Sequence, residues 1–523
     1  MAYSAGYSIR HLPNLATGLN NQYDAGEILD TDIADMENIE VDSKSIKNAG
    51  GYVNYGSSEG PYWGIFNARF ENGVERMIRQ RQGTLEYDEG AGDWTECTLP
   101  TSGSPASTVV LTQRGCSFAM LNDTVLWSNG EDVVMSSSDG ITWTLEGDLP
   151  KSQVLFNNGL NRILFLAQPG EPSRIDWSDI NTPLTVGADS YQYFGKNDGQ
   201  EIQDVALLPN GAMILFKTNR FYEISDVTLD TVSTSPIGEA PCVRYTVQST
   251  ENSVIWAGPD GKVYELFGGV PNFISDNIQR LNITKPQSMR AIYHNNKYRL
   301  AVPEGSNDYN SLEYVVSRNI PSGRQNNPYV ITKNTRYIGC YGREDREVGG
   351  SRRSRVYFGD SRKVAIGSPA SIPGVFAWIN QEHDQAVTQG ILGQAQDCSL
   401  TTKFYTENGT YSLKRYVKYF INLKSSASQE ITIGYRFAPF EAFTEIKLLT
   451  SAPAITWMFS DSSTGNFNEG FGFSSEADLR EYKSLERGAT EPRGIQFKIS
   501  WSSIQDVEIL SQAVKFLSKT TFY

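Results

Sequence analysis

The chain has 523 residues, of which 39% are hydrophobic and 20% are charged, so it can form two or three domains around a large core. A formal net charge of −14 argues against general affinity for nucleic-acid phosphates, although a chain of this charge could surround DNA without gripping it. The N-terminus lacks the apolar core of a signal peptide, and no run approaches the ~18 apolar residues of a membrane span. We therefore expect a protein that is made in a cytoplasm and does not span a membrane.

The cysteines are scattered along the chain, and none belongs to a C-x-x-C pair. Such a set is typical of free thiols in a reducing compartment. The five residues are Cys97, Cys116, Cys242, Cys340 and Cys398.

The first predicted element is the acidic stretch "GEILDTDIADMENIEVD" at residues 26–42. Leu29, Ile33 and Met36 follow the spacing i, i+4, i+7, which predicts one apolar face of a short helix. A short strand then follows at residues 39–41. Carboxylates are expected to line the other face of this segment, facing either solvent or a channel: Asp30, Asp32, Asp35, Glu37, Glu40 and Asp42.

A segment of this size cannot bury a core by itself. We therefore predict that residues 1–60 form an N-terminal arm that docks on another domain or another chain, and that Leu29, Ile33 and Met36 are interface candidates. The alternative is an ordinary acidic surface helix.

Residues 61–370 carry short alternating runs bounded by Gly, Asn, Asp and Pro, which predict strands joined by turns. "GDWTECTLP" (92–100) is echoed by "TWTLEGDLP" (142–150), and Trp94 and Trp143 are 49 residues apart. "SSDGITWT" (137–144) resembles the aspartate-box turn of several β-propellers, in which Asp139 and Gly140 would shape the turn and Trp143 would pack between sheets. Since a blade takes roughly 40–50 residues, we predict a β-propeller of about six blades.

The regular pattern breaks near residues 304–355, where we expect an inserted loop or hairpin. The charge-dense stretch 341–360 contains arginines suited to oxyanion contacts, but carboxylates are interleaved with them. We interpret it as a subunit-interface or channel candidate, with a solvated loop as the alternative. The arginines are Arg343, Arg346, Arg352, Arg353 and Arg355.

Alternating runs return after a boundary at residues 367–373. They predict an antiparallel β-sandwich-like domain over residues 371–523. The expected fold is therefore mainly β: an N-terminal arm, a propeller and a C-terminal sandwich-like platform.

No catalytic pattern accompanies these elements. The three histidines are far apart, and no metal-ligand spacing, nucleotide-binding loop or nucleophile elbow occurs. The aspartate-box turn raises the possibility of a glycosidase, but the R-I-P element of sialidase-type propellers is absent. We expect a protein that is not an enzyme and has no catalytic residues, cofactor or bound metal.

The two chain ends resemble those of bacteriophage virion proteins. The resemblance lies in Gly18-Leu19-Asn20, in residues 29–42, in "GGY" at 50–52 and in the closing "RGIQFKISWSSIQDVEILSQAVKFL". Those proteins usually carry an arginine-rich R-x-G before the tyrosine, whereas this chain has Lys44 and Lys47. The size, the propeller and the terminal sandwich are similar to the tail nozzle, or tail tubular and packaged-DNA stabilisation, protein of short-tailed phages.

This resemblance implies a structural protein of the virion tail that forms a homo-hexameric ring below the portal and its adaptor protein. The ring would retain the packaged genome, conduct double-stranded DNA during ejection without sequence-specific contacts, and contact distal tail proteins such as tailspikes, fibres or a needle. The alternative is a receptor- or glycan-binding, or glycan-processing, propeller of a tail. A carbohydrate-binding propeller of a bacterial surface is disfavoured by the missing signal sequence.

Overall fold

The computed structural model describes residues 7–12, 15, 17–41, 45–49, 52–55, 61–81, 83–90, 92–100, 115–224, 229, 235–267, 269–279, 281–318, 329–348, 351–361, 375–378, 396–406, 413–425, 429–450, 478–484, 494–503 and 507–519. Almost all of their regular structure is β-strand, with a short 3-10 helix, η2, at Pro286–Ser288. In this part of the chain no helix is long and apolar enough to span a membrane. All five cysteines are buried and free.

Within the described residues, seven antiparallel sheets have four strands each. In order across each sheet they are β6 (Tyr62–Arg69), β7 (Glu75–Arg81), β8 (Thr84–Asp88) and β9 (Thr95–Glu96); β10 (Ser117–Leu121), β11 (Thr124–Ser128), β12 (Val134–Ser137) and β13 (Thr144–Glu146); β14 (Val154–Asn157), β15 (Ile163–Leu166), β16 (Arg174–Trp177) and β17 (Tyr191–Tyr193); β18 (Ile202–Leu207), β19 (Met213–Lys217), β20 (Arg220–Ile224) and β21 (Pro236–Glu239); β22 (Gln248–Ser249), β23 (Val254–Ala257), β24 (Val263–Phe267) and β25 (Val270–Phe273); β26 (Arg290–His294), β27 (Lys297–Val302), β28 (Leu312–Ser317) and β29 (Val330–Thr335); and β30 (Ile338–Val348), β31 (Ser351–Asp360), β32 (Val375–Trp378) and β5 (Tyr52–Asn54).

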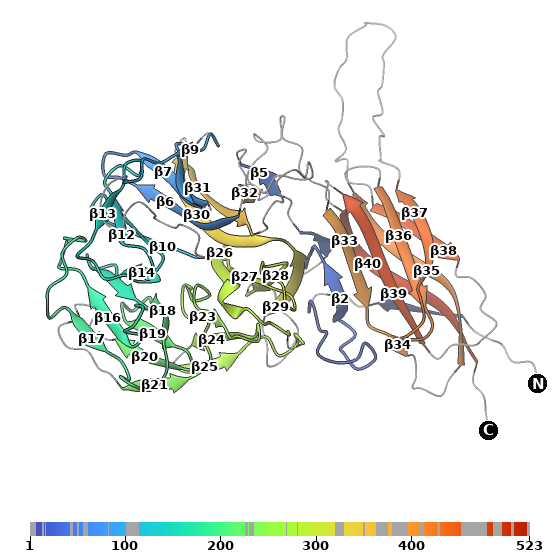
Figure 1. Cartoon of the computed structure of the whole chain (residues 1–523). Coiled ribbons are helices and arrows are strands. Elements are labelled where there is room, and N and C mark those ends of the chain that lie inside the picture. Colours follow the sequence, from blue (N-terminus) through green and yellow to red (C-terminus); the bar gives the residue numbers. More distant parts are fainter. Residues whose placement is uncertain are drawn as a thin grey trace, which may run out of the picture.

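These sheets form a closed ring. The first strand of each sheet contacts the first strand of the next, and β30 contacts β6. The result is a β-propeller-like arrangement, which we call the propeller ring (Figure 1). Some central strands are buried along their whole length because neighbouring sheets cover both of their faces; Met213–Lys217 of β19 is an example.

The propeller ring differs from the prediction in two places. Seven four-stranded sheets stand where about six were expected, because the last sheet combines β30–β32 with β5, a strand that precedes β6 in the chain. Two strands of that sheet therefore lie outside residues 61–370. Part of the range predicted as an inserted loop or hairpin is instead regular sheet, since Leu312–Ser317 forms the largely buried strand β28 and pairs with β27 and β29. Residues 319–328 lie outside the described part of the chain.

Two six-stranded sheets combine both ends of the chain. The β40 sheet contains β1 (Tyr7–Leu12), β3 (Ile39–Val41), β4 (Ile46–Asn48), β35 (Leu413–Ser425), β38 (Asp478–Ser484) and β40 (Val507–Lys519), and the β39 sheet contains β2 (Ile33–Glu37), β33 (Gln396–Thr402), β34 (Tyr405–Thr406), β36 (Gln429–Arg436), β37 (Thr444–Thr450) and β39 (Gly494–Ser503).

The two six-stranded sheets pack against each other beside the propeller ring (Figure 1). Tyr419 of β35 stacks on Phe497 of β39 with ring centroids 4.2 Å apart. Each sheet takes strands from residues 7–48 as well as from residues 396–519, so neither is complete without the N-terminal segment.

The helix predicted for residues 29–36 is wrong, because residues 33–37 form strand β2. The register of β2 against β33 shifts between Ile33 and Asp35, which marks a β-bulge. The extra residue of a bulge lets positions three apart face the same side. Ile33 and Met36 are therefore both fully buried in a strand, whereas Leu29 is 53% exposed in the preceding turn.

A helix would have placed Leu29, Ile33 and Met36 on one buried face, whereas the strand buries only Ile33 and Met36. Met36→Ala is expected to lower the free energy of unfolding by about 2–5 kcal/mol, because it leaves a cavity in a filled core. Leu29→Ala, the matched control, should change it by less than about 0.5 kcal/mol. Urea unfolding followed by tryptophan fluorescence measures both, and equal effects would contradict the strand assignment.

Candidate functional site

The aspartate-box turn is held by hydrogen bonds within residues 137–142. Asp139 Oδ1 accepts the backbone N–H groups of Ile141 and Thr142, both at 2.8 Å, and the Ser137 hydroxyl at 2.9 Å. Partial burial acts to raise the pKa of Asp139, but these hydrogen bonds outweigh it and hold the pKa below its usual value. Gly140 has φ +74°, a left-handed conformation that favours glycine.

Both predicted tryptophans lie between neighbouring sheets. Trp143 is 2% exposed and packs in one cluster with Ile78 of the preceding sheet, and Arg76 of that sheet donates to the Asp139 carbonyl oxygen. Trp94 donates through Nε1 to the Tyr55 carbonyl oxygen at 3.0 Å, just beyond β5. Asp139, Gly140 and the two tryptophans thus take part in contacts that hold neighbouring sheets together.

Side chains from several sheets meet at the centre of the propeller ring. The Arg290 guanidinium lies 4.5 Å from the Tyr245 ring centroid, and its Nη1 donates to the carbonyl oxygens of Gln287 and Met289. The Tyr245 hydroxyl donates to the Gln153 carbonyl oxygen at 2.7 Å. Gln153 precedes β14 and Tyr245 lies between β21 and β22, so this contact joins segments beside two sheets that are not neighbours in the ring.

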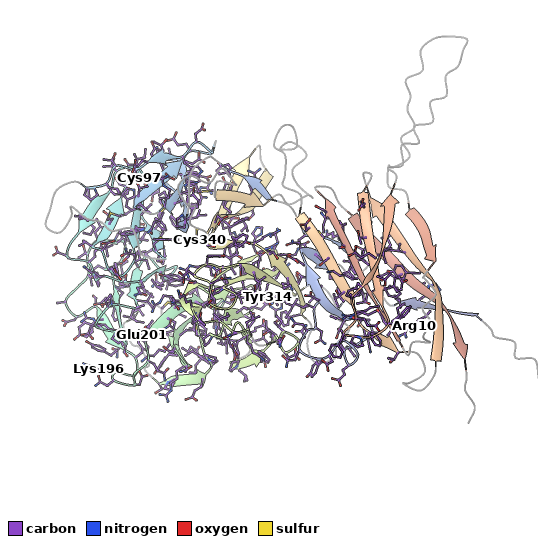
Figure 2. All side chains as sticks on the ribbon, turned by 45° about the vertical axis from the view of Figure 1, so that its right-hand side comes forward. Arg10, Cys97, Lys196, Glu201, Tyr314 and Cys340 are labelled. Atoms are coloured by element: carbon purple, nitrogen blue, oxygen red, sulfur yellow. The ribbon has the colours of Figure 1, made fainter. Side chains whose placement is uncertain are left out.

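Two buried cysteines complete this central packing. Cys340 lies near the middle of the propeller ring (Figure 2), and burial raises the pKa of its thiol and that of Cys116. A Cβ on Gly64 of β6 would lie 2.2 Å from Cys116 Sγ, so only glycine fits there. Raised thiol pKa values disfavour nucleophilic chemistry, because the thiolate is the reactive form.

Asp204 is a buried acid that contacts this central packing through Tyr245. Its carboxylate accepts the backbone N–H groups of Val205 at 2.9 Å and Tyr245 at 3.1 Å. Burial raises the pKa of Asp204 to about 7, although these hydrogen bonds and the charge of Arg244 oppose the shift. The charge of Asp204 also acts to raise the pKa of the nearby Cys242, Tyr245 and Tyr298 side chains. A cluster that could hold a metal ion is absent from the described residues.

The N-terminal carboxylates do not line one free face. Asp30 forms ion pairs with Arg10 and Lys403. Asp32 is fully buried and accepts Thr17 Oγ1, Asn20 Nδ2 and the Leu29 backbone N–H. This part of the segment is therefore fixed to its own chain. Asp30 stays partly exposed although it is paired, whereas the burial of Asp32 corrects, for that residue, the expectation that these carboxylates face solvent or a channel. Asp42 lies outside the described residues.

The remaining carboxylates bind strands β29 and β27 of the propeller ring. Asp35 pairs with Lys333 at 2.8 Å, and Glu37 accepts the Thr335 hydroxyl. Glu40 pairs with Lys297 at 3.0 Å. Burial acts to raise the pKa of Glu40, but the charges of Lys297 and Arg299 outweigh it and lower the pKa. Residues 33–40 therefore join the propeller ring to the two six-stranded sheets.

The predicted arginine stretch forms the β30–β31 hairpin. Glu344 pairs in register with Arg355, Arg346 with Arg353, and Glu347 with Arg352. Arg343 Nε lies 2.8 Å from Asp345 Oδ2, so one of the candidates already has a carboxylate partner within the strand. The side chains of Arg346, Arg352 and Arg353 lie outside the described part, and the interface assignment stays a prediction.

His294 attaches this hairpin to β26. Its Nε2 bonds to Ser354 Oγ at 2.8 Å, and Ser354 in turn donates to Asp345. Burial and the positive charges of Arg343 and Arg299 lower the pKa of His294 to about 4. It is therefore a neutral structural contact, and His383 lies outside the described residues.

No protein-family model matches the sequence, and the search of curated proteins found no relative. Among solved structures, virginiamycin B lyase from Staphylococcus aureus is similar at 12% identity, with 62% of this chain and 97% of that chain covered and a TM-score of 0.37. An exo-beta-1,3-galactanase from Phanerochaete chrysosporium is similar at 9% identity, with 84% and 100% covered and a TM-score of 0.26. Structural similarities with TM-scores this low support no conclusion about activity.

The aspartate-box hydrogen bonds can be tested by removing the acceptor. Asp139→Ala leaves two backbone N–H groups without their carboxylate, so we expect it to lower the free energy of unfolding by about 1–2 kcal/mol. Asp148→Ala, an exposed aspartate beyond the turn, should change little. A urea titration compares the two, and an unaffected Asp139→Ala variant would show that the turn needs no anchor.

Asp204 predicts a pH dependence. Its pKa is higher in the folded chain than the ordinary aspartate value, so its contribution to stability is present below the unfolded pKa and is lost as pH rises through about 7. We expect the urea midpoint to fall between pH 5 and pH 8, and Asp204→Asn to remove part of that fall. Asp189→Asn, at an exposed position, should keep the wild-type profile. Identical profiles for all three chains would refute the shift.

Proposed function

We propose that the chain is a structural component of a bacteriophage tail. In this proposal copies assemble into a homo-hexameric nozzle below the portal adaptor, which retains and then conducts the genome. A seven-bladed propeller is carried on a platform made from the β40 and β39 sheets. The distal tail proteins and the passing double-stranded DNA are its partners in the virion.

One observation carries this proposal. The terminal segments that resemble virion proteins, residues 18–52 and 493–517, meet in three dimensions, because β3 and β4 lie in one sheet with β40, and β2 lies in one sheet with β39. Such a unit of both chain ends would serve as the platform that carries the propeller in the proposed nozzle. The packing of the propeller axis is also consistent with a structural role, since its buried side chains are engaged with one another.

Glycan binding is a second candidate, and a pair of tyrosines on the outermost strand β17 favours it. Tyr191 is 37% exposed and meets Tyr193 edge to face with centroids 5.8 Å apart. Arg174 lies 4.1 Å from the Tyr191 ring centroid, and Lys196 lies 4.2 Å from that of Tyr193. Aromatic faces beside charged donors can bind polar ligands that have one apolar side.

The oligomeric mass of the full chain separates the two candidates. A nozzle is expected to give a concentration-dependent assembly of six copies by mass photometry and six-fold rings in negative-stain images. The structural proposal would be overturned if the chain were monomeric at every concentration, bound glycans, and lost that binding in the Tyr191→Ala variant. Leu184→Ala, at another exposed apolar position of this sheet region, is the matched control.

A further inference from the structure

The loop between β36 and β37 exposes a phenylalanine completely. Phe440 lies in residues 437–443 and is 100% exposed, more than any other large apolar side chain in the described part of the chain. Pro439 and Ala442 beside it are exposed as well. The β36–β37 hairpin forms the edge of the β39 sheet away from the propeller ring (Figure 1). Since burying an aromatic side chain is strongly favourable, Phe440 can anchor a docking contact.

The loop is held in one conformation although Phe440 is exposed. Arg436 Nε donates to Gln496 Oε1 at 2.7 Å, and its Nη1 donates to the Glu441 carbonyl oxygen at 3.2 Å. The same guanidinium lies 4.5 Å from the Phe443 ring centroid. At the start of the loop, Phe437 packs against the hydrophobic core. A preorganised loop loses little conformational entropy on binding, so its anchor keeps most of its contact energy.

A second loop, residues 22–29, lies at the same end of the β39 sheet. Gln496 Nε2 donates to the Thr402 carbonyl oxygen at 2.7 Å, so it connects β36 and β39 to the end of β33. Just after β33, the Phe404 N–H donates to the Ala25 carbonyl oxygen at 2.8 Å. A continuous set of hydrogen bonds therefore links the two loops across the strand ends.

Carboxylates are in excess at this end of the sheet, counted over the residues that the structure describes. The exposed ones on the two loops and at the start of β37 are Asp24, Glu27, Glu441 and Glu445. Lys403 already pairs with Asp30, and Arg436 is bound beneath the β36–β37 loop. Such a surface repels anionic lipids and nucleic-acid phosphates, and it attracts lysine and arginine side chains.

We propose that Phe440 docks on a different protein, whose surface has an apolar pocket with lysine or arginine at its rim. Phe440 would enter the pocket, and the exposed carboxylates of the two loops would approach the cations. A second copy of this chain fits less well, because its own net charge is −14. The inference goes beyond the proposed nozzle and does not depend on the number of copies in an assembly.

The test uses the full chain, with a labelled amphipathic helical peptide of leucine and lysine as the probe. We expect Phe440→Ser to raise the dissociation constant of the peptide about tenfold, because one buried aromatic anchor is lost. The urea midpoint should not change, since the side chain is fully exposed. Ile180→Ser, at a 57% exposed apolar position of the propeller ring, is the matched control and should bind as the wild type does. Fluorescence anisotropy measures all three chains.

Three results would overturn the inference. The first is equal binding of the leucine–lysine peptide by the wild type and Phe440→Ser. The second is equal binding of a polylysine peptide, because charge alone would then explain the affinity. The third is an assembly mass that rises with concentration in the wild type but not in Phe440→Ser, because the loop would then bind a second copy.

The outcomes also separate this contact from the proposed nozzle. Six-fold rings in the wild type, with peptide binding that Phe440→Ser leaves unchanged, would overturn the docking contact and leave the nozzle proposal standing. A monomer at every concentration that binds the peptide through Phe440 would support the docking contact and overturn the self-assembling ring.

Discussion

The arrangement of this molecule depends on Asn38, a single residue between strands β2 and β3. Its φ of +55° turns the chain sharply, a left-handed conformation that asparagine tolerates better than most residues. Its backbone N–H donates to the Lys333 carbonyl oxygen, and its side-chain oxygen accepts the Thr335 N–H on the propeller ring. Its Nδ2 donates to the Asp397 carbonyl oxygen of β33. One side chain thus joins the ring to the β39 sheet.

Around that joint a single hydrophobic core extends through both parts. It runs from Ile255 and Tyr298 of the propeller ring, through Met36 and Ile39, to Leu400 and Phe497 of the β39 sheet. Domains separated by polar, water-filled interfaces move relative to one another by default, but a shared apolar core removes that freedom. The propeller ring and the six-stranded sheets are therefore expected to act as one rigid body, and a load on one is transmitted to the other.

Sequence patterns correctly predicted the features that depend only on residues close together in the chain. Alternating runs indicated the strands, and the spacing around Asp139 indicated a turn beside a buried Trp143. The periodicity wrongly predicted a helix at residues 29–36, because the register shift in β2 gives a strand the three-residue apolar spacing that is typical of a helix. The pairing of β5 with β32 joins positions more than 300 residues apart, and the arm's carboxylates find partners such as Lys333. Such pairings could not be predicted from the sequence, because a local pattern does not show which distant residues will be neighbours in the fold.

These internal partners change how the negative charge of the chain can act. Asp35 and Glu40 already pair with lysines, so they contribute little to a field that a passing DNA duplex would feel. Asp24 and Glu27 of the loop at residues 22–29 remain exposed, and a contact between copies through this loop would combine their charges with the exposed apolar side chains of Tyr23 and Leu29. A contact with both apolar and ionic parts weakens with salt only in its ionic part, since screening acts on charges and not on buried apolar area. Partial salt sensitivity is therefore the expected behaviour of an assembly held by such loops, whereas complete dissolution by salt would indicate contacts made of charge alone.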